Sequence, residues 1–143
     1  MIAVMNYEFA LELAKRLHEG QVDKAGEAYI NHPLKVAEYV ENEEEIVRVV
    51  AVLHDTVEDT PMTVELIRVL FGNEVGNAIE SLTKKPGEEY MEYIQRVKKN
   101  QIAAKVKLAD LRHNSELSRL SEVTEKDIMR VEKYKKAMEI LNG

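Results

Sequence analysis

The 143-residue chain has 45% hydrophobic and 32% charged residues, an ordinary composition for a globular domain that is large enough to bury a core. It has no cysteine, which excludes disulfides, thiolate metal ligands and a cysteine nucleophile, so any metal must be held by imidazole and carboxylate. The formal net charge of −6 argues against a surface for nucleic-acid polymers, but it allows a small anionic substrate in a locally positive pocket.

Residues 1–143 contain no internal repeat, low-complexity stretch or linker, so we expect a single domain. The apolar start of the chain is too short for a signal peptide, and no apolar run reaches the length of a bilayer. These features predict a cytoplasmic protein with no membrane partner and leave its oligomeric state open.

Apolar residues recur along the chain at the 3.6-residue spacing of amphipathic helices. A first helix is expected from the capping residue Asn6 to near Gly20, and further helices are expected over residues 33–40, 46–57, 63–71, 73–82, 89–99, 102–117 and 124–141. Residues 21–31 and 84–88 are predicted to be loops. No segment alternates with a period of two, so the predicted fold is an all-α bundle of about eight helices.

The run His54-Asp55-Thr56-Val57-Glu58-Asp59 is the centre of the candidate site. On one continuous helix His54 lies over Glu58, and Asp55 lies over both Glu58 and Asp59. Three carboxylates near the negative end of a helix dipole destabilise a fold unless a cation offsets their charge. The alternative is a solvated acidic helix end with a chance histidine.

Two further residues favour a metal site. His32 stands before Pro33 at the start of a helix, and Asp110 shares a helix face with Lys107 and Asn114. Two histidines and two aspartates suit an octahedral Mn²⁺ or Fe²⁺ ion that keeps positions open for water and phosphate oxygen. Zn²⁺ is an alternative, although it is more often tetrahedral.

The wider pattern resembles a known family. His54-Asp55 with the distant His32 and Asp110 is similar to the HD superfamily of phosphohydrolases. Motifs between residues 7 and 135 resemble, in order, the hydrolase domain of the RelA/SpoT-type alarmone enzymes. They are HEGQ at 18–21, KAGEAYINHP at 24–33, LHDTVEDT at 53–60, FG at 71–72, LTK at 82–84, and VKLAD at 106–110 with Asn114. With no synthetase or regulatory domain attached, the chain resembles a stand-alone small alarmone hydrolase.

The resemblance implies one HD phosphohydrolase domain that uses Mn²⁺ to remove the 3′-pyrophosphate of guanosine tetra- or pentaphosphate, (p)ppGpp, which yields GDP or GTP. It implies four metal ligands, His32, His54, Asp55 and Asp110. It implies that the attacking water is oriented and activated by an acidic pair, Glu58 and Asp59. It also implies that a small-molecule nucleotide substrate is contacted by three residues, Lys24, Asn114 and Arg130.

Two positions depart from the family pattern. Asp23 stands where the family usually has an arginine that helps to hold the purine, and Leu111-Arg112 follow the last ligand where the family usually has arginine or lysine directly. An aspartate cannot stack as a guanidinium does, although it could accept hydrogen bonds from a base edge. The first departure leaves open an enzyme for another nucleotide, such as an adenosine alarmone or a nucleotide monophosphate. A separate alternative is a non-catalytic nucleotide-binding or antitoxin-like partner.

Phosphate-ester hydrolysis also sets requirements of its own. It needs a metal that activates water and a carboxylate within hydrogen-bond reach of that water, and Glu58 is the expected base, assisted by Asp59. Three residues in or beside these motifs are expected to have other roles. His18 is expected to be a hydrogen-bonded structural histidine, Tyr29 a packing residue beside the site, and His113 a surface residue.

Overall fold

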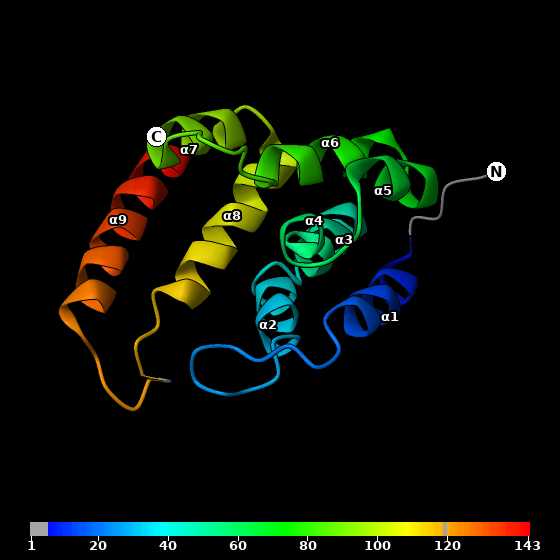
Figure 1. Cartoon of the computed structure of the whole chain (residues 1–143). Coiled ribbons are helices and arrows are strands. Elements are labelled where there is room, and N and C mark those ends of the chain that lie inside the picture. The colour runs from blue at the N-terminus through cyan, green and yellow to red at the C-terminus, as the bar shows by residue number, and fades with distance from the viewer. Residues whose placement is uncertain (1–5, 119) are drawn as a thin grey trace.

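The computed structural model describes residues 6–118 and 120–143 of the chain. These residues form α1 (Tyr7–Leu17), α2 (Asn31–Tyr39), α3 (Glu45–Leu53), α4 (Thr56–Asp59), α5 (Val64–Phe71), α6 (Asn73–Leu82), α7 (Tyr90–Lys98), α8 (Gln101–Asn114) and α9 (Glu125–Asn142) (Figure 1). Within the described residues there is no strand, only an isolated β-bridge between Val22 and Ala28. Eight helices have eight or more residues and α4 is a single turn, so the predicted all-α fold of about eight helices is confirmed.

Capping residues set several helix starts where the sequence predicted them. The side chain of Asn6 accepts the backbone N–H of Phe9 at the start of α1, and Thr63 accepts that of Leu66 at the start of α5. Each bond satisfies an N–H group that has no partner inside its helix. Gly72 ends α5 with a φ of 96°, a left-handed conformation that glycine adopts without a steric penalty.

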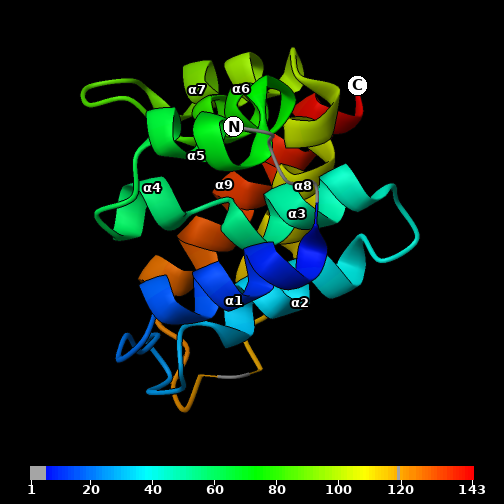
Figure 2. The same cartoon turned by 90° about the vertical axis from the view of Figure 1, so that its right-hand side faces the viewer.

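Helix α3 lies at the centre of the bundle and packs against α1, α2, α6 and α8 (Figures 1 and 2). Its residues Val49, Val50, Ala51, Val52 and Leu53 are fully buried. Burial of a valine or leucine side chain contributes about 1.5–3 kcal/mol, so this helix is a rigid support for the residues that follow it.

The predicted helix over residues 46–57 is wrong in its last four residues. Helix α3 ends at Leu53, His54 follows as its C-cap, and Asp55 has φ −116° and ψ 10° before the separate turn α4 begins. The Thr56 hydroxyl donates to the Leu53 carbonyl at 2.9 Å and satisfies an oxygen that the helix leaves without a partner as it ends. The break changes the directions in which His54 and the acidic residues point.

Two connections meet at one end of the molecule. The loop between α1 and α2 and the segment between α8 and α9 both lie at the bottom of Figures 1 and 2. Helix α8 ends at Asn114, three residues before the predicted end, so the chain leaves it earlier than expected. Among the described residues, no helix is both long enough and apolar enough to cross a membrane.

Candidate active site

The loop before α2 directs His32 into the interior. Asp23 organises this loop, because its Oδ1 accepts the backbone N–H groups of Ala25 at 2.9 Å and of Glu27 at 3.0 Å. Gly26 supplies the left-handed φ of 81° at the tip. His32 then enters the first turn of α2 with 7% of its surface exposed.

His54 reaches the same point from the end of α3. Its Nδ1 lies 2.7 Å from the Ala51 carbonyl oxygen, to which it donates, so its Nε2 is left with a lone pair. This Nε2 lies 3.2 Å from Oδ1 of Asp110, and Nε2 of His32 lies 2.8 Å from the same oxygen. The break after α3 thus brings together groups from α2, from the end of α3 and from α8.

The donor set of His32, His54 and Asp110 fits a divalent cation. Their ligand atoms all lie within 4.8 Å of one another, and all three residues are buried. Neighbouring ligands at right angles around a metal, each about 2.1 Å from it, are about 3 Å apart. The two separations at Asp110, 2.8 Å and 3.2 Å, match this spacing.

Asp55, the fourth predicted ligand, is buried beside this cluster. Its Oδ2 lies 3.7 Å from Nε2 of His54 and accepts a hydrogen bond from the Tyr29 hydroxyl. Its Oδ1 is 3.4 Å from Nε2 of His18, and neither atom has a hydrogen-bond partner within the described part of the chain. A buried carboxylate oxygen without a hydrogen bond is costly, and a cation would compensate for that cost.

Buried charges of both signs shape the cluster. Burial by itself would raise the pKa of Asp110, but the Lys107 ammonium, 2.9 Å from Oδ2, and the two imidazoles hold that pKa well below its usual range. Burial opposes a proton on His54, yet the charges of Asp55 and Asp110 raise its pKa to about 9. The excess negative charge therefore attracts a proton to His54, and a divalent cation can take that proton's place.

The acidic pair Glu58 and Asp59 lines the same cavity, whose volume is about 210 Å³. Oε1 of Glu58 accepts the backbone N–H of Lys84 at 3.2 Å, and Oδ2 of Asp59 accepts the Tyr29 hydroxyl at 3.2 Å. The pKa of each carboxyl is raised, first by partial loss of hydration and further by the nearby carboxylate of Asp55. A raised pKa makes a carboxylate a better proton acceptor.

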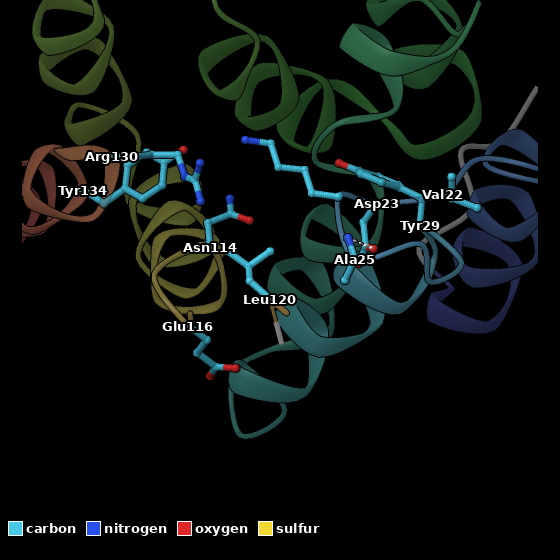
Figure 3. Close-up of a pocket in the computed structure, with 10 residues that line it drawn as sticks. Val22, Asp23, Ala25, Tyr29, Asn114, Glu116, Leu120, Arg130 and Tyr134 are labelled. Carbon is cyan, nitrogen blue, oxygen red and sulfur yellow. Dashed lines mark hydrogen bonds between the residues drawn. The ribbon is translucent and has the colours of Figure 1, made fainter. Parts of the chain in front are cut away.

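The residues predicted to contact the substrate are Lys24, Asn114 and Arg130. They line a second cavity, whose volume is about 340 Å³. Figure 3 shows Arg130, Tyr134 and Asn114 on one side of this cavity, with Asp23 and Tyr29 on the opposite side. Asp23, Tyr29 and Asn114 line both cavities, so the two adjoin. A volume in the range of about 300–1,000 Å³ is typical of small-molecule sites.

Three residues have a larger part in the site than the sequence indicated. Lys107 pairs with Asp110, as their shared helix face would have suggested, and Tyr29 bonds two carboxylates instead of only packing beside them. The prediction that His113 lies on the surface is wrong, because it is 5% exposed and its Nδ1 is 2.7 Å from Nδ1 of His32. His18 is the hydrogen-bonded histidine expected, with Nδ1 2.8 Å from the Gln21 side chain.

The fold and the cluster define an all-α protein with a candidate metal site. Comparison with known proteins identifies the family. The model of the HD domain family matches residues 10–136, so the chain belongs to the HD domain family, as the sequence predicted. A solved structure of a metazoan SpoT orthologue, described as hydrolysing ppGpp and playing a role in starvation responses, superimposes with a TM-score of 0.79. The two chains are 25% identical, and the match covers 100% of this chain and 89% of the other.

Longer bacterial proteins also match. A probable GTP pyrophosphokinase of Mycobacterium leprae is 36% identical over 116 residues, which cover 73% of this chain. A guanosine-3′,5′-bis(diphosphate) 3′-pyrophosphohydrolase of Aquifex aeolicus is 46% identical over 79 residues, which cover 52%. The matched regions are only 15% and 11% of these two relatives, and the names of the relatives include both synthesis and hydrolysis.

Proposed function

We propose that this HD domain, over residues 1–143, is a Mn²⁺-dependent hydrolase that removes the 3′-pyrophosphate of (p)ppGpp. The products are GDP or GTP and pyrophosphate. The main support is the arrangement of two adjoining cavities, one with the His/His/Asp cluster and the acidic pair, and the other with Lys24 and Arg130. The metazoan SpoT orthologue that hydrolyses ppGpp has the same fold. The cytoplasmic location expected from the sequence belongs to the same proposal.

The cluster residues His32, His54, Asp55 and Asp110 are the proposed metal ligands. When bound, Mn²⁺ would lower the pKa of a water molecule and polarise a phosphoryl oxygen. Buried carboxylates and a neutral imidazole Nε2 suit Mn²⁺ or Fe²⁺, and Zn²⁺ is a further alternative.

Glu58 is the proposed proton acceptor, with Asp59 assisting. In the proposed reaction a water oxygen attacks the phosphorus attached to the 3′ oxygen, the bond between these two atoms breaks, and Glu58 takes a proton from the water. Glu58 then passes that proton on to the 3′ oxygen, which leaves as a hydroxyl, and the pyrophosphate carries the oxygen of the water. The backbone N–H of Lys84 donates to Oε1 of Glu58 and helps to orient the carboxylate in the cavity.

Lys24, Asn114 and Arg130 are the proposed nucleotide contacts. Lys24 and Arg130 supply positive charge for phosphate groups in a chain that is negative overall. Arg130 also forms an ion pair with Asp127 at 3.0 Å, which restrains its guanidinium. The amide of Asn114 donates to Asp110 at 3.0 Å, so one residue links the nucleotide cavity to a proposed ligand.

The identity of the purine depends on the wall that contains Asp23. Its Oδ1 accepts two backbone N–H groups of the loop, so this residue organises the cavity wall and cannot stack on a base as the family arginine does. This observation favours testing adenosine 3′-pyrophosphates as the second candidate substrates.

A substrate panel tests the proposal. The purified chain would be incubated with Mn²⁺ and with guanosine 3′-pyrophosphates, adenosine 3′-pyrophosphates or simple nucleotide phosphates, and the products would be identified chromatographically. We expect pyrophosphate release, with guanosine substrates turned over faster than adenosine substrates. Faster turnover of the adenosine substrates would show that adenine, and not guanine, is the preferred purine. Release of phosphate from monophosphates alone would contradict the proposed pyrophosphate-releasing reaction.

A control separates an enzyme from a non-catalytic binding partner. A partner of that kind would bind nucleotide without turnover even when Mn²⁺ saturates the site. Metal analysis and nucleotide binding measured on the same preparation would show whether inactivity comes from an empty metal site or from a site that lacks catalytic ability.

A further inference from the structure

His113 lies three residues after Asp110 on α8, and its ring meets that of His32 edge to edge. The two Nδ1 atoms are 2.7 Å apart, the ring planes are 19° from parallel, and the ring centroids are 4.9 Å apart. Because each Nδ1 is at the rim of its ring, this centroid distance is what two nearly coplanar rings give when they share a hydrogen bond. Both residues are buried.

One of the two Nδ1 atoms must carry the hydrogen, and the other must accept it. Nε2 of His32 faces Asp110 at 2.8 Å and is the nitrogen within the ligand cluster. A metal-binding nitrogen needs its lone pair, so the proton of a neutral His32 must be on Nδ1. His113 is then the acceptor, and its own proton is on Nε2.

His54 shows the same arrangement with a different acceptor. Its Nδ1 donates to the Ala51 carbonyl oxygen at 2.7 Å, an oxygen that can only accept. An imidazole can donate or accept, so His113 fixes the tautomer of His32 only while its own Nδ1 is unprotonated. His32 and His54 would therefore both carry their proton on Nδ1, but His32 would donate it to an imidazole and His54 to a backbone carbonyl.

We propose that His113 is a positioning residue that holds the ring and the tautomer of His32 so that Nε2 is available for the metal. His113 is not among the residues that line the two cavities or that make up the His/His/Asp cluster. The proposal rests on the metal site of the proposed function, but it concerns metal affinity and does not depend on which nucleotide is hydrolysed.

Substitutions can separate the acceptor role of His113 from its contribution to packing. His113→Asn places a carbonyl oxygen at the δ position and keeps an acceptor, whereas His113→Phe keeps a ring but has no acceptor. Tyr39→Phe is a matched control, because the Tyr39 ring lies against His113 with centroids 6.4 Å apart but its hydroxyl bonds to Glu116.

The measurement is the Mn²⁺ affinity of the full chain without nucleotide, determined by isothermal titration calorimetry. We expect wild-type affinity for His113→Asn and Tyr39→Phe and about 10–100-fold weaker binding for His113→Phe, the usual effect of losing a partner that orients a metal-binding histidine. Wild-type affinity for His113→Phe, or equal loss in His113→Asn and His113→Phe, would overturn the proposal.

A measurement on the unaltered protein keeps the proposal testable if His113→Phe does not fold. Nitrogen-15 NMR of the protein loaded with diamagnetic Zn²⁺ reports the tautomer of each imidazole. We expect the proton of His32 on Nδ1 and that of His113 on Nε2, and the opposite assignment would overturn the role of His113. Unaltered protein that binds neither Mn²⁺ nor Zn²⁺ would overturn the metal site and this proposal together, whereas wild-type affinity in His113→Phe would overturn this proposal alone.

Discussion

Substitution of Lys107 by methionine tests the balance of buried charge in the site. The Lys107 side chain is 13% exposed, and its Nζ lies 2.9 Å from Oδ2 of Asp110, whose side chain is 5% exposed. Methionine retains most of the length and the apolar stem of lysine but removes the charge. The substitution therefore removes the ammonium beside the buried Asp110 carboxylate and leaves it with the His32 and His54 imidazoles and the Asn114 amide.

The geometry sets the size of the effect. At an effective dielectric constant of about 20, the attraction between unit charges 2.9 Å apart is about 6 kcal/mol. Methionine also removes the cost of burying an ammonium, so the net loss is smaller. We expect the free energy of unfolding of the metal-free protein to fall by about 3–5 kcal/mol, the loss typical when one partner of a buried ion pair is removed.

Mn²⁺ should restore part of this stability, because the site lacks one positive charge and attracts a cation more strongly. Urea unfolding in EDTA and in excess Mn²⁺ measures both effects. Lys105→Met is the matched control on the same helix, since Lys105 is 51% exposed and forms a surface pair with Glu43. An Lys107→Met variant as stable as wild type in EDTA, or one that gains less from Mn²⁺ than wild type does, would refute the charge argument.

Three further substitutions test other parts of the site. Glu58→Gln should leave Mn²⁺ bound but lower kcat by about 10²–10⁴-fold, and near-normal turnover would refute the role of Glu58 as base. Tyr29→Phe removes the hydroxyl that bonds Asp55 and Asp59, so kcat should fall while the melting temperature changes little, and unchanged kcat would show that the hydroxyl only packs. Asn100→Ala removes the N-cap of α8 and should cost about 1 kcal/mol in urea unfolding, with Mn²⁺ affinity unchanged; a large loss of affinity would mean that the start of α8 controls the site.

Local signals in the sequence were sufficient to place the starts of the eight longer helices to within two residues. Helix starts follow capping side chains such as Asn6 and Thr63, whose effect is confined to one turn. The end of α3 could not be predicted in this way, because the apolar pattern continues to Val57. A hydrogen bond from Thr56 to the Leu53 carbonyl satisfies the end of α3 where that pattern gives no signal to stop.

The surroundings of the cluster depend on tertiary packing, which a single helix does not reveal. His113 was misplaced because its helix face is buried only when α2 packs against α8. The Tyr29 hydroxyl reaches the carboxylates of Asp55 and Asp59 because hydrogen bonds from the loop backbone to Asp23 shape the loop before α2. By contrast, the grouping of His32, His54 and Asp110, which span 79 positions of the chain, followed from residue types and a family pattern.

Product analysis of a Mn²⁺-loaded preparation tests the central claim most directly. Guanosine tetraphosphate would be incubated with the unaltered chain, with Glu58→Gln and with the unaltered chain in EDTA, and the nucleotide and phosphate products would be quantified together. We predict equal amounts of GDP and pyrophosphate from the unaltered chain with Mn²⁺, and little of either from the other two reactions. Full Mn²⁺ occupancy with intact guanosine tetraphosphate, or equal product formation by Glu58→Gln, would contradict the account.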